Sequence, residues 1–463
     1  MTPRALLAAL ALGLVALLLA ALVLWRRGFF SVRSARREFR ARIDRFKRVG
    51  KGHVRRQLLA DERVAQAVRE HAAQTGEDEE RAWARVRGYV EEIVPHFNLL
   101  SYYRLGYGVA RLLIPLFYKV SVGYEARAEL DALPRDASVV YLMNHRSNAD
   151  YVVVAYVLSG RVAISYAVGE WARVWPLEAV FKSFGSYFVR RRYRERLYHA
   201  VLERYVQLIT RNGVTQGIFL EGGLTRDWRF REPKLGLLDY LLRVKRDADF
   251  TRPLRIVPVA INFDRVLEDR SLLREVQSED ERLTRLEQAR EVVSYVFKVS
   301  LRFLLRRARR YGRAAVNFGA PFDVDAWLRA HPGVLDLPRP ERLASLDELA
   351  REVMARIAAV MPVTPVPLAC SALLRLPGTR VTQAEWEAEL ERLRAGLRAA
   401  GAHVVGDERA SAEILERALV MLTLRRVVFP EGDGFRVDRR QELLLRYYAN
   451  SIEHFLGPAP EAA

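Results

Sequence analysis

The N-terminal segment restricts the possible structures most, because it contains an uninterrupted apolar run. Residues Ala5 to Trp25 carry no charge over 21 positions. An α-helix of this length is about 31 Å long, which matches the hydrocarbon core of a bilayer. A cleaved signal peptide is the alternative, but its apolar core is usually shorter, and Val23 and Leu24 make a poor small-residue cleavage site. We therefore predict a transmembrane anchor over residues 1–28.

Basic residues are distributed very unevenly around this run. Only Arg4 precedes it, whereas ten arginines and lysines lie between Arg26 and Arg48. The positive-inside rule therefore predicts a single-pass protein of the cell membrane whose chain after the anchor lies in the cytoplasm. Apolar residues such as Val32 and Phe39 recur at helical spacing among these charges. This pattern favours a helix in the lipid headgroup layer over a solvated linker helix.

Composition narrows the remaining possibilities. The chain has 463 residues, of which 50% are hydrophobic, so disorder is excluded for its bulk. Its net charge of +19 predicts polyanionic partners. A second basic amphipathic stretch runs from Val296 to Arg313, and its basic face would contact lipid, an acidic carrier protein or only water. Cys370 is the only cysteine, which excludes disulfides and multi-cysteine zinc sites. No HExxH motif is present, so we do not predict metal catalysis, and no GxxxxGK[ST] loop is present to support nucleotide hydrolysis.

The pattern of apolar residues changes near Asp136. Residues 54–113 are highly charged, with apolar positions at helical spacing, and predict a helical N-terminal region. Beyond Asp136, short β-branched runs alternate with helical stretches, which predicts an α/β fold with a central mixed sheet flanked by helices. The expected strands are 139–143, 162–168, 187–189, 218–220, 256–261 and 315–318, and the expected later helices are 346–361, 383–399, 411–420 and 441–455.

His145 stands out among the eight histidines, because it ends the strand-like run VVYLMNH and precedes RSNAD. On one continuous helix His145 and Asp150 would lie about 140° apart, so they can meet only across a turn. With Ser147 as the helix N-cap, Asp150 would lie in the first turn of a helix over 148–158. Its carboxylate would then hold one imidazole N–H and leave the other nitrogen to accept a proton. A purely structural capping box of Ser147 and Asp150 is the alternative.

Two further strand-like runs are followed closely by glycine or arginine. The first lies in Gly185 to Arg191 (GSYFVRR) and the second in Phe219 to Arg226 (FLEGGLTR). Ligand sites of α/β sheets lie at such strand ends, and glycines let main-chain N–H groups approach an anion. Arg190, Arg191 and Arg226 are therefore candidates for binding a phosphate, with a solvated basic face as the alternative for 190–194. The chain has no GxSxG nucleophile, so a His–Asp pair would more simply activate a bound alcohol.

Taken in order, HRSNAD, GSYFVRR, FLEGGLTR and IVPVAI resemble the four sequence blocks of the glycerolipid acyltransferases, of which the first is His-x4-Asp. Within that superfamily the chain resembles the membrane-bound glycerol-3-phosphate 1-O-acyltransferases, because Arg146 follows the histidine and two glycines follow Glu221. EPKLG, VNFGAPF, VTPVPL and LRYYANSIEH extend the likeness to His454. Leu224 departs from the pattern, because it stands where the family usually has arginine.

The resemblance implies an enzyme that transfers an acyl group from acyl-CoA or acyl-carrier protein to the sn-1 hydroxyl of glycerol 3-phosphate. His145 would be the general base, oriented by Asp150. Arg190, Arg191, Arg226 and Lys234 would hold the acceptor phosphate, and Glu221 would position the acceptor. The full set of expected substrate-binding residues is Arg146, Ser147, Gly185, Arg190, Arg191, Glu221, Gly222, Gly223, Arg226 and Lys234. No cofactor is implied beyond the acyl co-substrate. Membrane phospholipid, and not nucleic acid, becomes the expected polyanionic partner.

Two alternatives stay open. The first keeps the chemistry and changes the acceptor to dihydroxyacetone phosphate or a lysophospholipid. The second is a non-catalytic, membrane-anchored scaffold that binds anionic lipid or a carrier protein. In the leading interpretation, the anchor is followed by a basic and charged helical region over 29–113, an acyltransferase α/β domain over 114–330, and a C-terminal helical region over 331–463 packed on that domain.

Overall fold

The computed structural model describes residues 50–96, 108–158, 162, 164–169, 173, 177–190, 193–266, 269 and 311–457. The predicted anchor, the basic segment behind it and nearly all of the stretch 296–313 lie outside these residues. Within the described ranges, no helix has both the length and the apolar character needed to cross a membrane.

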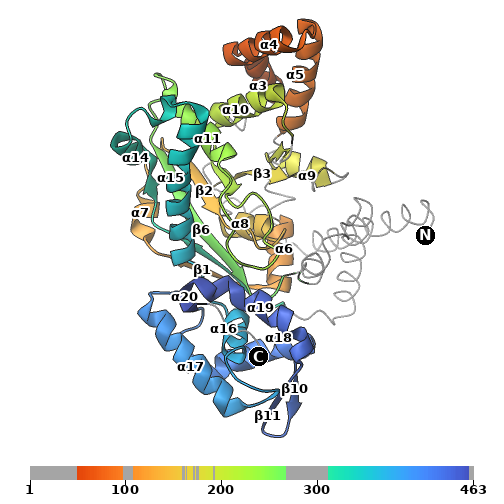
Figure 1. Cartoon of the computed structure of the whole chain (residues 1–463), viewed down its shortest axis with the longest axis vertical. Coiled ribbons are helices and arrows are strands. Elements are labelled where there is room, and N and C mark those ends of the chain that lie inside the picture. Colours follow the sequence, from red (N-terminus) through yellow and green to blue (C-terminus); the bar gives the residue numbers. More distant parts are fainter. Residues whose placement is uncertain are drawn as a thin grey trace, which may run out of the picture.

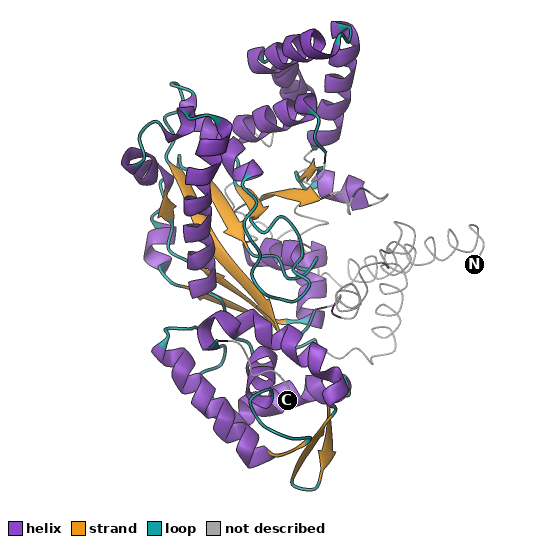
Figure 2. Ribbon diagram, in the orientation of Figure 1, coloured by secondary structure: helices purple, strands orange, loops and turns teal. Residues whose placement is uncertain are grey.

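A mixed eight-stranded sheet forms the centre of the molecule (Figure 2). Its strand order is β1-β7-β6-β2-β5-β3-β4, and β8 pairs with β6. Strands β6, β2, β5, β3 and β4 run parallel, whereas β7 is antiparallel to β6. The prediction of a central mixed α/β sheet is therefore confirmed. The strands are β1 (Lys119–Tyr124), β2 (Ser138–Met143), β3 (Ser165–Gly169), β4 (Tyr187–Val189), β5 (Gln216–Phe219), β6 (Leu254–Phe263), β7 (Arg313–Phe318) and β8 (Phe322–Asp323).

Helices cover both faces of this sheet, so its central strands are apolar on both sides. Alternate residues of β2 show the division: Val139, Tyr141 and Met143 pack in one core cluster, and Val140 and Leu142 pack in the other. The first cluster includes α6, α8 and the C-terminal helices, and the second includes α10, α11, α15 and the N-terminal helices. These helices are α6 (Gly108–Phe117), α7 (Arg127–Asp131), α8 (Asp150–Leu158), α9 (Leu177–Ser183), α10 (Arg196–Arg211), α11 (Gly236–Leu242), α14 (Val324–Ala330) and α15 (Arg339–Ala359).

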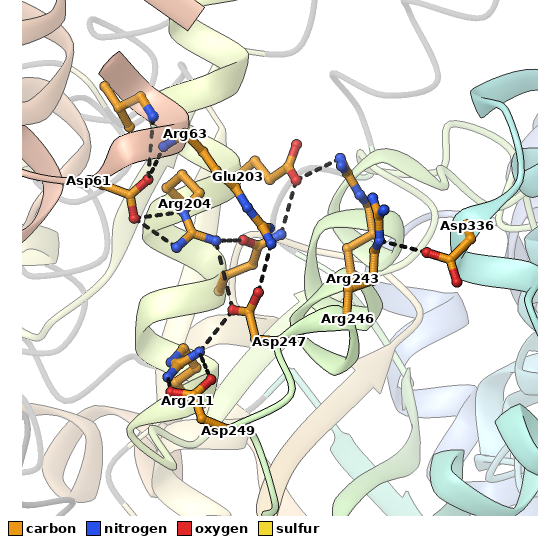
Figure 3. Close-up of polar contacts among 12 residues, drawn as sticks. Asp61, Arg63, Glu203, Arg204, Arg211, Arg243, Arg246, Asp247, Asp249 and Asp336 are labelled. Carbon is orange, nitrogen blue, oxygen red and sulfur yellow. Dashed lines mark hydrogen bonds and ion pairs between the residues drawn. The ribbon is translucent and has the colours of Figure 1, made fainter. Parts of the chain in front are cut away.

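The N-terminal helices pack on α10 at one end of the molecule (Figure 1). They are α3 (Lys51–Leu59), α4 (Glu62–Thr75) and α5 (Glu79–Ile93), which confirms the helical interpretation over their length. Asp61 caps α4 by accepting from the N–H groups of Arg63 and Val64, and it also pairs with Arg204 of α10 at 2.7 Å. Asp247, after the 3-10 helix η4 (Arg243–Arg246), accepts from Arg63 and Arg211, so ion pairs join three segments distant in sequence (Figure 3).

The C-terminal helices lie at the opposite end, beside a three-stranded sheet (Figure 1). Helix α17 has the predicted bounds. Helix α15 begins seven residues before the predicted start, and α18 ends four residues after the predicted end. Helix α16 and the small sheet were not predicted. The elements are α16 (Pro365–Leu373), α17 (Gln383–Ala399), α18 (Ser411–Leu424), α19 (Glu442–Ala449), α20 (Glu453–Leu456), β9 (Arg380–Thr382), β10 (Val428–Glu431) and β11 (Gly434–Val437), with 3-10 turns η5 (Val334–Asp336), η6 (Arg439–Gln441) and η7 (Asn450–Ile452).

Candidate active site

The candidate site is built on the turn between β2 and α8, at the carboxyl end of a fully buried strand. Asn144 fastens this turn to β6: its side-chain amide donates to the Ile261 carbonyl at 2.9 Å, and its Oδ1 accepts from the Ile261 N–H at 2.8 Å. His145 follows directly, so its backbone is fixed between β2 and the loop after β5. Sequence reasoning missed Asn144, although a buried asparagine at a strand end is a signal for such a tie.

His145 and Asp150 are in direct contact. His145 Nδ1 lies 2.8 Å from Asp150 Oδ2, and the two side chains are 1% and 0% exposed. The imidazole also stacks on Phe219, with ring centroids 4.0 Å apart. With the proton on Nδ1 donated to the carboxylate, Nε2 is the nitrogen that can accept a proton from a substrate.

Asp150 also fixes the turn itself. The same Oδ2 accepts from the backbone N–H groups of Arg146 at 2.8 Å and Ser147 at 3.1 Å, while Ser147 Oγ accepts from the Ala149 N–H at 3.1 Å. The structural and the chemical interpretation of this spacing are thus compatible, because one carboxylate makes both sets of contacts. A carboxylate held by backbone donors also keeps the imidazole in one orientation.

Glu221, which follows Leu220 at the end of β5, is buried beside this turn. Its Oε1 accepts from the His145 backbone N–H at 3.1 Å and its Oε2 accepts from the Arg231 N–H at 3.2 Å. Burial raises the pKa of Glu221 to about 7, and the nearby Arg146 guanidinium opposes this shift. Glu221, which the sequence predicts to position the substrate, contacts the backbone of the proposed base.

Arg146 is fully buried and turned towards the loop after β5. Its Nη1 donates to the carbonyls of Trp228 and Arg229, and its guanidinium lies 5.0 Å from the centre of the Phe230 ring. Burial lowers the pKa of Arg146. These contacts make Arg146 a link between the His145 turn and the 225–230 loop.

The glycine-rich loop after β5 brings Lys234 close to the backbone. Gly222 has φ 68°, and a Cβ there would lie 2.5 Å from Lys234 Cγ, so only glycine fits this approach. Lys234 and Arg226 are exposed, whereas Gly223 and Thr225 are buried. Thr225 N–H donates to the His145 carbonyl at 3.1 Å, so both backbone groups of His145 are held by this loop region.

The remaining predicted residues follow β4 or lie next to it. Gly185 has φ 81° in the turn before β4. Arg190, at the end of the same strand, donates from Nε to Glu92 of α5 at 2.7 Å, and this bond raises its pKa. Arg191 lies outside the described residues.

The C-terminal helices hold the 225–230 loop from the other side, which sequence reasoning did not foresee. Trp228 is fully buried with φ 64°, a backbone conformation that costs a bulky residue roughly 1–3 kcal/mol. Tyr447 stacks on its indole at 4.8 Å, and Asn450 Nδ2 donates to the Asp227 carbonyl at 2.9 Å. Arg229 Nε pairs with Glu453 at 2.7 Å. The segment LRYYANSIEH therefore supports the loop that supports His145.

A thiol and possible metal ligands also lie in the described part of the chain. Cys370 is buried, and burial raises the pKa of its thiol far above the usual range. No cluster of three or more His, Cys, Asp or Glu side chains that could hold a metal ion occurs among the described residues. His145, oriented by Asp150 at the edge of the sheet, is suited to removing a proton from an alcohol.

Comparisons with known proteins agree with this class of site. Residues 127–262 match the family model Acyltransferase, and residues 290–459 match the model of the glycerol-3-phosphate acyltransferase C-terminal region. The two matched models, both of acyltransferases, support a glycerolipid acyltransferase.

Several curated relatives are similar over most of this chain. A glycerol-3-phosphate acyltransferase from Aeromonas hydrophila subsp. hydrophila is 29% identical over 422 residues, which are 88% of this chain and 50% of the relative. One from Actinobacillus succinogenes is 28% identical over 414 residues, 86% of this chain and 49% of the relative. The chain thus spans about half the length of these relatives.

A solved structure was also found to be similar. It is the 1-acyl-sn-glycerophosphate acyltransferase PlsC from Thermotoga maritima, with 16% sequence identity and a TM-score of 0.31. The match covers 60% of this chain and 83% of that chain.

Proposed function

We propose that the protein transfers a fatty acyl group from acyl-CoA or acyl-carrier protein to the sn-1 hydroxyl of glycerol 3-phosphate, making lysophosphatidate. One observation carries the proposal: His145 Nδ1 lies 2.8 Å from Asp150 in the turn after β2. The relatives named above, which are glycerol-3-phosphate acyltransferases, supply the acceptor class.

In the proposed reaction His145 acts as the general base. Its Nε2 accepts the proton of the sn-1 hydroxyl while the oxygen attacks the carbonyl carbon of the thioester, and Asp150 stabilises the imidazolium that forms. The tetrahedral intermediate then collapses, the carbon–sulfur bond breaks, and the leaving thiolate takes the proton back from His145. The products are the ester and the free thiol, so the step needs neither an acyl-enzyme nor an external acid.

Labelled acceptor and two acyl donors test this function. Membranes that contain the protein are incubated with glycerol 3-phosphate and either palmitoyl-CoA or an acyl-carrier thioester, beside membranes that contain His145→Ala. We expect lysophosphatidate from the wild type and a loss of roughly 10²- to 10⁴-fold in the variant, the usual contribution of a general base. Equal activity in both, or no product with either donor, contradicts the proposal.

A change of acceptor is tested in the same assay, because Leu224 leaves one arginine fewer in the block after β5. Dihydroxyacetone phosphate and a lysophospholipid are offered in parallel arms. Ester formation only on one of these would keep the chemistry and replace the acceptor. No ester in any arm would leave the membrane-bound scaffold as the function.

We further propose that the protein is a single-pass protein of the cell membrane with its α/β domain on the cytoplasmic side. The uncharged run from Ala5 to Trp25 and the ten basic residues behind it support this location. The product is a lipid, so a site tethered at the membrane surface would release it where phospholipid is made.

A further inference from the structure

Two arginines from different segments meet on one carboxylate of α5. Glu92 Oε1 accepts from Arg190 Nε at 2.7 Å and from Arg173 Nη1 at 2.8 Å, and Glu92 Oε2 accepts from Arg190 Nη2. Glu92 is 9% exposed, whereas Arg190 and Arg173 are 24% and 29% exposed. One negative and two positive charges leave the group with a net charge of +1.

Neighbouring tyrosines hold Arg190 in place within this group of three charges. Its guanidinium lies 4.6 Å from the ring centre of Tyr193 and 5.7 Å from that of Tyr198, and the Tyr198 hydroxyl accepts from the Arg190 backbone N–H at 2.8 Å. Arg190 Nη1 and Arg173 Nη2 have no hydrogen-bond partner among the described residues. Two part-exposed guanidinium groups with unused N–H donors suit a phosphate monoester, which accepts several charge-assisted hydrogen bonds.

Arg190 follows β4, and His145 lies after β2, at the same edge of the sheet. Strands β2, β5, β3 and β4 are neighbours and run parallel, so the residues after β2 and β4 lie on the same edge. Three strand spacings separate them, roughly 14 Å. This is the separation that the Arg190 side chain and the three-carbon acceptor would have to bridge.

The block after β5 lacks one expected cation, because Leu224 is partly buried against the apolar core where arginine is usual. We propose that Arg173, joined to Arg190 through Glu92, binds the acceptor phosphate and supplies the positive charge that Leu224 does not. This inference rests on the proposed function, since it assigns the phosphate of that acceptor. Nothing in the sequence blocks pointed to Arg173.

Steady-state kinetics with each substrate varied in turn test Arg173. We expect Arg173→Ala to raise the KM for glycerol 3-phosphate roughly 10- to 100-fold, with the KM for the acyl donor changed less than twofold. Arg173→Lys, which keeps the charge and loses the planar fork, should fall between wild type and alanine. Arg81→Ala is the matched control, because Arg81 is an exposed arginine of α5, and it should leave both KM values unchanged.

A second readout separates this inference from the proposed function. Inorganic phosphate binding is measured by isothermal titration on the full-length wild type and Arg173→Ala, with melting temperatures to verify folding. Weaker binding by the variant supports the site. Equal phosphate affinity, or KM values for both substrates that rise together, overturns the role of Arg173 even if the wild type makes lysophosphatidate. Absence of lysophosphatidate from a wild type that binds phosphate through Arg173 overturns the proposed acylation alone.

Discussion

At the scale of single residues, the site depends on buried polar groups that hold the backbone of His145. Glu221 and Thr225 bind its N–H and its carbonyl, and Asp150 binds its ring and the two N–H groups that follow. A general base must keep its position during proton transfer, because small displacements cost much of the rate. The chemistry proposed for one histidine thus depends on three neighbours.

Glu221 gives this arrangement a dependence on pH. Its pKa is about 7 in the folded protein, against 4.5 for an ordinary glutamate. Between about pH 4.5 and 7 the folded protein therefore keeps a proton that the unfolded chain has released, so Glu221 lowers stability as pH rises through this window. We predict that wild type loses stability relative to Glu221→Gln across this window, by at most about 1.4 kcal/mol per pH unit.

Denaturant unfolding of both proteins at a series of pH values measures this effect. Glu232→Gln is the control, because Glu232 is an exposed carboxylate of the same loop and pairs with Arg351 on the surface. Its stability should follow that of wild type at every pH. Parallel curves for wild type and Glu221→Gln would show that Glu221 does not titrate in this range.

The proposed reacting residues are easier to predict from the sequence than the residues that hold them in place. His145 and Asp150 are visible because a strand end, a helix cap and a five-residue spacing coincide in one short segment. Arg146 and Glu221 were assigned to substrate, since nothing local shows that one points to the 228–229 carbonyls and the other to a backbone N–H. Such contacts join segments about 80 residues apart, and only the assembled fold determines them.

At the scale of elements, the C-terminal helices pack against the 225–230 loop and stabilise it. Asn450 in η7 reaches the Asp227 carbonyl, and Tyr447 of α19 stacks on the strained Trp228. Arg146 then connects this loop to the His145 turn. A substitution in the C-terminal helices should therefore alter the candidate active site without removing a contact with the substrate.

Asn450→Ala tests this connection. The variant loses one part-buried hydrogen bond from a side chain to the backbone, so we expect a stability loss of about 1 kcal/mol and a several-fold lower kcat with KM nearly unchanged. Asn212→Ala is the control, because Asn212 makes the same kind of bond, to the Leu208 carbonyl at 2.8 Å, at the end of α10. Equal kcat in the two variants would mean that the C-terminal helices contribute to stability alone.

The elements were predictable where apolar periodicity is clear. Strand β2 and helix α17 follow from their patterns, and α17 also has a capping box at Thr382. Strand β1 was missed because its residues are only partly buried and include Lys119 and Gly123. Helix α16 was missed because Pro365 and Pro367 occupy its first turn. Proline is tolerated at this position of a helix, but in a sequence it usually indicates a loop.

At the scale of the whole molecule, the described chain has the sheet in the middle, with the N-terminal helices at one end and the C-terminal helices at the other (Figure 1). The N-terminal helices are fixed to the sheet domain by the ion pairs of Asp61 and Asp247 (Figure 3). The ion pair of Glu92 with Arg190 adds a further connection. The α5 helix is thereby connected to Arg190, the residue that follows β4. This matters because residues 1–49 contain the predicted anchor.

Protease protection in sealed membrane vesicles tests the predicted topology. The charge difference across the Ala5 to Trp25 run should orient the chain with residues after Trp25 in the cytoplasm. We therefore expect the folded domains to be digested in vesicles whose cytoplasmic face is outside, and to be protected in vesicles of the opposite orientation. Replacing Arg26, Arg27 and Arg33 by glutamine, together with three lysines inserted before Ala5, should increase the protected fraction in the first kind of vesicle. Protection of the wild-type domains from cytoplasmic protease contradicts the orientation, and an intact mass that lacks the N-terminal run identifies a cleaved signal peptide instead.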